Sequence, residues 1–136
     1  MLAVGQEKIG KISEEAVKAV GAFGGGLAGS GGPCGIMLGG VAFISSMYSR
    51  GNLEGKEDPR MWSLSGKFMQ KFNTLCEEFA STNCRDIAQV NWQDREAAKE
   101  YYGNPESRRK ICIRLIGDAA CALGEILDQD ASKEPR

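Results

Sequence analysis

The chain is best approached through Gly24 to Tyr48, GGGLAGSGGPCGIMLGGVAFISSMY, on which the rest is arranged. Ten of the 18 glycines lie between Gly21 and Gly40, so a flexible loop leads into Pro33. Proline suits the first turn of a helix because it has no N–H to lose there. The sequence therefore predicts a helix from Pro33 to about Ser49, apolar nearly all round and hence central and mostly buried.

Cys34 falls at about the second position of this expected helix. Free backbone N–H groups and the helix dipole favour a negative charge there, so we expect its thiol to ionise more easily than a free one. That makes Cys34 a candidate nucleophile or metal ligand. The alternative is a small buried residue with no chemistry, since free cysteine often packs as a small hydrophobe.

Three glycines, Gly35, Gly39 and Gly40, are spaced to line one side of the same helix. A glycine inside a helix costs up to about 1 kcal/mol relative to alanine, so something should approach closely at these positions. A neighbouring helix is the favoured explanation. A cofactor lying against Gly35 and Gly39 is the other.

Composition narrows the classes of function. The chain has 17 basic and 18 acidic residues, a net charge of −1, so nothing points to nucleic acid or to an anionic membrane as a partner. It has no histidine, which excludes cysteine–histidine dyads, histidine-ligated zinc and haem with a proximal histidine. No signal peptide is visible, and the uncharged run is too rich in glycine for a membrane span.

Hydrophobic periodicity predicts helices and no strands. We expect a compact all-α single domain of five or six helices over residues 1–127, followed by a polar tail at residues 128–136. Before the helix that begins at Pro33, we expect one helix that ends before Gly10 and one that is capped by Ser13. After it we expect an amphipathic helix, whose apolar stripe is Trp62, Met69, Phe72, Leu75, Cys76 and Phe79. A short helix at Cys84, one at Asp94–Tyr102 and a last one from about Glu106 to Leu127 complete the chain.

Five cysteines are many for such a chain, and an odd number does not suit a disulfide framework. Cys84 follows a probable cap, Asn83, so it is a second thiol at an expected helix start, with Arg85 beside it. Cys112 lies on the inward face of the last helix, whereas Cys121 is roughly 180° around from it and should be at the surface. Cys76 lies on an apolar stripe and is expected in the core.

Several familiar motifs are absent. No Cys-x-x-Cys occurs, so thioredoxin-like and zinc-ribbon sites are excluded. The glycine loop lacks the Gly-Lys-Ser/Thr of a phosphate loop, and no expected strand precedes it as a dinucleotide fold requires.

The chain resembles the redox-active protein family named for the pattern C-GCAxxG-C-C. The match is carried by Phe23-Gly24-Gly25-Gly26, by Cys34-Gly35-Ile36-Met37-Leu38-Gly39, by Asn83-Cys84-Arg85-Asp86 and by Cys112. Ile36 stands where alanine is common, and the first of the four family cysteines is missing. In relatives it precedes an apolar segment like Leu2-Ala3-Val4-Gly5, so we expect it just upstream of Met1 in the natural protein.

The resemblance implies a bacterial or archaeal redox protein that uses Cys34, Cys84 and Cys112. These thiols could exchange with disulfides, hold an iron–sulfur cluster, or bind zinc with a water as fourth ligand. A redox protein or a transporter-associated protein would be the partner, in the cytoplasm. The alternative is a non-catalytic helical module that binds a partner or forms a homo-oligomer, with structural cysteines.

Overall fold

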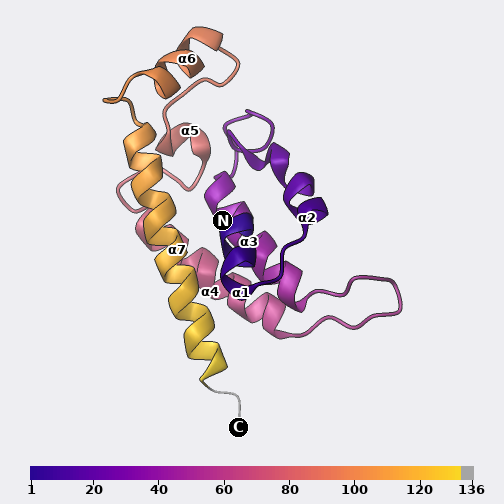
Figure 1. Cartoon of the computed structure of the whole chain (residues 1–136). Helices are drawn as coiled ribbons and strands as arrows, with labels where there is room; N and C mark the ends of the chain where they lie inside the picture. The colour runs from indigo at the N-terminus through magenta and orange to yellow at the C-terminus, as the bar shows by residue number, and fades with distance from the viewer. Residues whose placement is uncertain (133–136) are drawn as a thin grey trace.

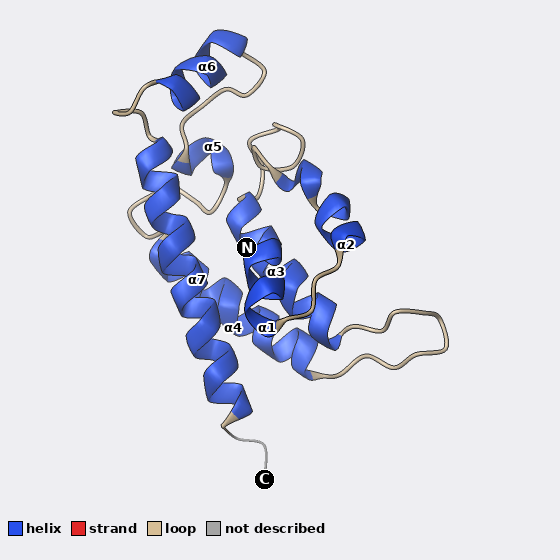
Figure 2. Cartoon of the chain, in the orientation of Figure 1, coloured by secondary structure: helices blue, strands red, loops and turns tan. Residues whose placement is uncertain are grey.

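The computed structural model describes residues 1–132 and shows an all-helical domain in that part (Figures 1 and 2). In the described residues the only strand-like pairing is one isolated bridge between Pro33 and Asn83. In chain order the elements are α1 (Leu2–Ile9), α2 (Glu14–Ala19), the 3₁₀ turn η1 (Gly21–Phe23), α3 (Gly35–Tyr48), α4 (Arg60–Leu75), α5 (Cys84–Ile87), α6 (Arg95–Gly103) and α7 (Arg109–Ala131).

The described residues form seven α-helices, one or two more than the expected total of five or six, and each of the seven lies at a segment that was expected to be helical. Leu2–Ile9 stands as a helix of its own because Gly10 ends it in the left-handed conformation, with φ 69°. The next helix begins as predicted, since the Ser13 hydroxyl accepts a hydrogen bond from the N–H of Ala16. At the other end α7 continues to Ala131, past the expected limit at Leu127. Residues 133–136 of the expected polar tail lie outside the described part.

The core forms where α3, α4 and α7 pack together, with α1 against the other side of α3. Its largest fully buried side chains are Phe68, Phe72, Ile44, Leu64 and Ile87. Gly40 lets α3 and α4 meet closely, because a Cβ there would lie 2.2 Å from Cε1 of Phe68. Gly40 therefore serves close packing of α3 on α4, the explanation favoured for the glycines of this helix.

Helix α1 runs alongside α3 in the same direction. Built Cβ atoms show the register, since one at Gly39 would lie 3.0 Å from the Cβ of Met1 and one at Gly5 would lie 2.7 Å from the ring of Phe43.

The face of α4 that is buried differs from the expected stripe. Met61, Leu64, Phe68 and Phe72 face the core, whereas Trp62 is 68 % exposed and Met69 is 42 % exposed. Positions 61 and 62, and again 68 and 69, are both apolar, so periodicity alone could not choose between two adjacent stripes. Ile116, expected on the inward face of α7, is likewise exposed.

Two short helices cluster at the start of α7. Figure 1 shows α5 and α6 at this end of the domain, with the glycine-rich segment beside α5. The long loop between α3 and α4 lies at the opposite side of the molecule. Within residues 1–132, no helix combines the length and the apolar character that crossing a bilayer requires.

Candidate functional site

The isolated bridge between Pro33 and Asn83 brings two of the predicted thiols together. The N–H of Cys34 donates to the carbonyl of Thr82 at 3.1 Å, and the N–H of Cys84 donates to the carbonyl of Gly32 at 2.7 Å. Cys34 and Cys84 therefore each directly follow a residue of the bridge. They lie close enough that a negative charge on Cys84 would raise the pKa of Cys34.

The glycine loop between η1 and Pro33 is built to hold α5. Its N–H groups bond inward, as those of Gly31 and Gly32 do to the carbonyls of Gly25 and Gly26 at 2.9 and 3.0 Å. The carbonyl of Gly31 instead accepts from both the backbone N–H and the Nε of Arg85. The N–H groups of residues 27–32 donate within the glycine-rich segment, so they are not free to bind an anion.

Within the glycine loop, Gly26 packs directly against Cys84. Its φ is 73°, and a Cβ there would lie 2.4 Å from the carbonyl oxygen of Gly32 and 2.8 Å from the Cβ of Cys84. Only glycine fits, because of both the backbone conformation and the space. Gly26, the last glycine of the motif Phe23-Gly24-Gly25-Gly26, thus affects the position of Cys84 through packing.

Cys112, half-buried near the start of α7, joins the other two. It packs against the main core, which contains Cys34, and also against a smaller cluster of Cys84, Ala88 and Tyr101. The three thiols predicted from the sequence therefore converge from three separate helix starts. Cys76, at the end of α4, also lies near Cys34. A negative charge on Cys34 would raise the pKa of Cys76.

Burial controls the ionisation of these thiols. It raises the pKa of Cys34 above the ordinary value, and negative charge on Cys84 and Cys112 would raise it further. The N–H groups of Ile36 and Met37 act in the opposite direction but do not win. Burial likewise raises the pKa of Cys84. The expectation that these helix-start thiols ionise easily is therefore wrong, because desolvation outweighs the helix-start donors.

Two aromatic side chains contact the thiols, and sequence reasoning missed both. The indole Nε1 of Trp92 donates to the Sγ of Cys84 at 3.3 Å, which opposes the effect of burial on the pKa of that thiol. Tyr101 is buried and hydrogen-bonded to Cys112, and burial first, then this bond, raise its pKa, so its hydroxyl keeps the proton. The two rings stack edge to face with centroids 5.0 Å apart. In the sequence, the contact of Trp92 with Cys84 could have been suspected only from the spacing of eight residues between them.

The remaining cysteines lie where the helical spacing predicted. Cys76 is a buried core residue, and burial raises its pKa to about 12. Cys121 is exposed, with its Sγ 3.8 Å from an Oε1 of Glu125 on the next turn of α7. All five cysteines are free thiols.

A bound metal or cofactor would need ligands and space near Cys34, Cys84 and Cys112. In residues 1–132 no three side chains of cysteine, aspartate or glutamate are placed to hold a metal ion. Gly35 and Gly39 both line a hollow of about 380 Å³, although a Cβ built at Gly35 would meet the carbonyl of Phe23 and one at Gly39 would meet the Cβ of Met1. The donor set of the described residues does not fit a cluster or zinc.

Comparison with known proteins identifies a family for the chain. The model of a family described as "Putative redox-active protein (C_GCAxxG_C_C)" matches residues 1–126. Neither the curated proteins nor the solved structures contain a significant match.

Proposed function

Because this chain belongs to the C-GCAxxG-C-C family of redox-active proteins, we propose that it carries out thiol–disulfide exchange with Cys84 and Cys112 as the reacting pair. The observation that carries the proposal is the convergence of thiols from separate helices onto one small cluster, in which Cys112 packs against Cys84. Cys34 is the third thiol, on the side of the main core.

The hydrogen-bond donors single out this pair. Cys84 has the indole N–H of Trp92, and Cys112 has the hydroxyl of Tyr101. A donor aimed at sulfur stabilises a thiolate as it forms or leaves, which both halves of an exchange require. Cys34 and Cys84 are buried to a similar extent, at 6 % and 8 % exposure, but no side-chain donor contributes to the pKa of Cys34.

The reaction balances with a disulfide as co-reactant. A thiolate of the pair attacks the disulfide of a partner, forms a mixed disulfide and releases one partner thiolate, which takes up a proton. The second thiol loses its proton, attacks the protein sulfur of the mixed disulfide and releases the other partner thiol. The partner gains two electrons, and the pair becomes a disulfide. The reverse direction oxidises a partner dithiol.

The raised pKa of Cys84 sets the pH dependence. A thiol whose pKa lies above its ordinary value is almost wholly protonated at neutral pH, so few molecules carry the attacking thiolate. The exchange rate should therefore rise steadily with pH across the neutral range and beyond pH 8.5.

Other features of the proposal remain predictions. They are a cytoplasmic location, a redox or transporter-associated partner, homo-oligomer formation and a further thiol upstream of Met1.

The test is to oxidise the folded protein with a glutathione redox buffer and to map disulfides by mass spectrometry. We expect a Cys84–Cys112 disulfide, lost in Cys84→Ser and in Cys112→Ser, and kept in Cys121→Ser, the matched control at an exposed thiol. Folded thiols that stay reduced at every potential would favour the non-catalytic helical module. Stoichiometric iron and acid-labile sulfide in protein purified without oxygen would overturn the proposal in favour of a cluster.

A further inference from the structure

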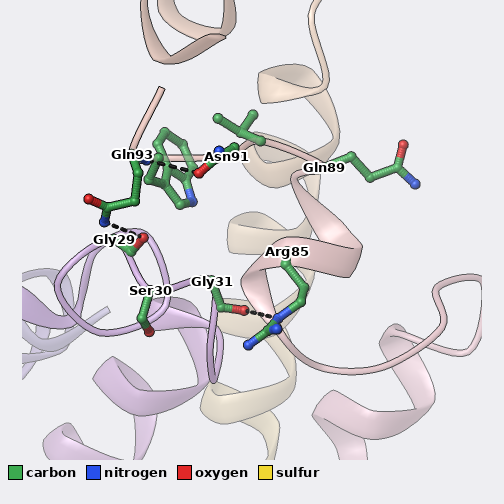
Figure 3. Close-up of a pocket in the computed structure, with 9 residues that line it drawn as sticks. Gly29, Ser30, Gly31, Arg85, Gln89, Asn91 and Gln93 are labelled. Atoms are coloured by element: carbon green, nitrogen blue, oxygen red, sulfur yellow. Dashed lines mark hydrogen bonds between the residues drawn. The ribbon is translucent and has the colours of Figure 1, made fainter. Parts of the chain in front are cut away.

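A hollow of about 370 Å³ lies between the glycine loop and the segment that joins α5 to α6 (Figure 3). Its size is at the lower end of the roughly 300–1,000 Å³ usual for small-molecule sites. Its walls come from two stretches distant in sequence, which are Gly29, Ser30 and Gly31 on one side and Arg85 with residues 89–93 on the other.

The lining has one charged side chain, and it is a cation. Arg85 shares the lining with Gln89, Asn91 and Gln93, and no carboxylate lines the hollow. The amide of Gln93 donates to the carbonyl of Gly29 at 3.3 Å, and that of Gln89 points away from the other lining residues (Figure 3). The Nε of Arg85 is anchored on the carbonyl of Gly31 at 3.0 Å, which holds the guanidinium at the edge of the hollow (Figure 3). A planar, pre-oriented guanidinium is well suited to a carboxylate.

Trp92 connects the hollow to the thiol pair. Its ring lines the hollow, and its Nε1 lies 3.3 Å from the Sγ of Cys84. The loop packs on the same residue, because Cβ atoms built at Gly25 and Gly29 would each lie 3.2 Å from it. A molecule in the hollow is therefore separated from Cys84 by the indole of Trp92.

We propose that this hollow binds a small disulfide that carries carboxylates, with a carboxylate on Arg85 and the sulfur atoms directed toward Cys84 past a displaced Trp92. This rests on the proposed thiol–disulfide exchange and adds its substrate class and the order of attack. The Cys84 thiolate attacks one substrate sulfur, and the other half leaves as a thiolate and takes up a proton. Cys112 then loses its proton and attacks Cys84, which releases the second half as a thiol.

The kinetic test compares three disulfides that differ in charge. Glutathione disulfide carries carboxylates, hydroxyethyl disulfide is neutral and cystamine is cationic. We expect Arg85→Gln to slow exchange with glutathione disulfide roughly three- to tenfold more than exchange with the neutral disulfide, the range for loss of an exposed charge-assisted contact. Arg85→Lys keeps the charge and should retain the preference. Arg50→Gln, in the loop after α3, is the matched control.

The order of attack is tested by trapping. With Cys112→Ser, glutathione should remain attached to Cys84, whereas Cys84→Ser should form little adduct at Cys112. An adduct that forms on Cys112 at the wild-type rate in Cys84→Ser would overturn this order.

Binding is tested without any reaction, using S-methylglutathione as the probe. The chain has two tryptophans, and Trp62 is exposed on α4, so Trp62→Phe leaves Trp92 as the only tryptophan, whose fluorescence can be excited without that of the tyrosines. We expect a saturable change of its fluorescence, weakened by Arg85→Gln. No change at millimolar probe, or equal Arg85→Gln effects on all three disulfides, would overturn the site while leaving the exchange intact. Absence of exchange with every disulfide, alongside normal probe binding, would instead overturn the proposed function.

Discussion

At the scale of single residues, Gly26 couples the glycine loop to the thiol pair. Its left-handed backbone and its contact with Cys84 leave no room for a side chain. In the same loop Gly24 has φ −59° and ψ 149°, which any residue adopts, and a Cβ there would meet nothing within 4 Å. The two glycines therefore have different roles although the sequence alone does not separate them.

Gly26→Ala should destabilise the protein by at least about 1–2 kcal/mol, the cost of a left-handed Cβ, before the clash with Gly32 is counted. It should also displace Cys84, so that this thiol reacts faster with a small alkylating agent in the folded state. Gly24→Ala should be neutral or stabilise by about 0.4–1 kcal/mol. Urea unfolding and alkylation followed by mass spectrometry measure both effects. Equal behaviour of the two variants would show that Gly26 does not position the thiol.

At the scale of elements, α5 has only four residues and depends on its neighbours for its position. Gly32 and Gly31 accept its first N–H groups, and the Ser81 hydroxyl hydrogen-bonds the Asp86 carboxylate. Its last carbonyl, that of Ile87, accepts from the Nε and Nη2 of Arg108 at 3.0 and 2.9 Å. The position of Cys84 is thus set by contacts from the glycine loop and from the residue before α7.

Arg108→Ala should lower the free energy of unfolding by about 1–2 kcal/mol, because it leaves the buried end of α5 without its donors. It should also loosen Cys84 and speed its alkylation. Arg109→Ala is the matched control. The exposed side chain of Arg109 lies over the ring of Tyr102, with its guanidinium carbon 5.6 Å from the ring centroid, and it donates no hydrogen bond to a carbonyl of α5. Its effect should stay within about 0.5 kcal/mol. A larger loss from Arg109→Ala than from Arg108→Ala would contradict this account of α5.

At the scale of the whole molecule, buried thiols make stability depend on alkaline pH. The pKa of Cys76 rises from an ordinary 9.0 to about 12 in the folded chain, chiefly through burial. Between these values the unfolded chain releases the proton and the folded chain keeps it. The stability linked to this thiol is therefore fully present below pH 9 and is lost as the pH rises toward 12.

Cys76→Ala should accordingly show a shallower loss of stability between pH 9 and pH 11 than the wild type. The slope is the informative quantity, because removing a buried sulfur also lowers stability at every pH. Cys121→Ala should keep the wild-type slope, since that thiol is exposed in the folded chain. Denaturant unfolding at a series of pH values measures the slopes, and identical slopes for wild type and Cys76→Ala would disprove the linkage.

Much of the architecture could be predicted because it depends on local interactions. The all-helical class, the cap at Ser13, the short helix opened by Cys84 and the surface position of Cys121 all follow from spacing and capping within a few residues. Local spacing failed where two apolar stripes were equally good, as at Met61 and Trp62 on α4.

The thiol site needed the tertiary structure, because its parts lie far apart in the chain. The sequence indicated Cys34, Cys84 and Cys112 through helix starts and the family motif, yet the bridge between Pro33 and Asn83 and the start of α7 bring them together. Burial then reverses the expected ease of ionisation, since desolvation depends on everything packed around a sulfur and not on its place in a helix. The contact of Trp92 with Cys84 likewise arises only when a loop folds back over α5.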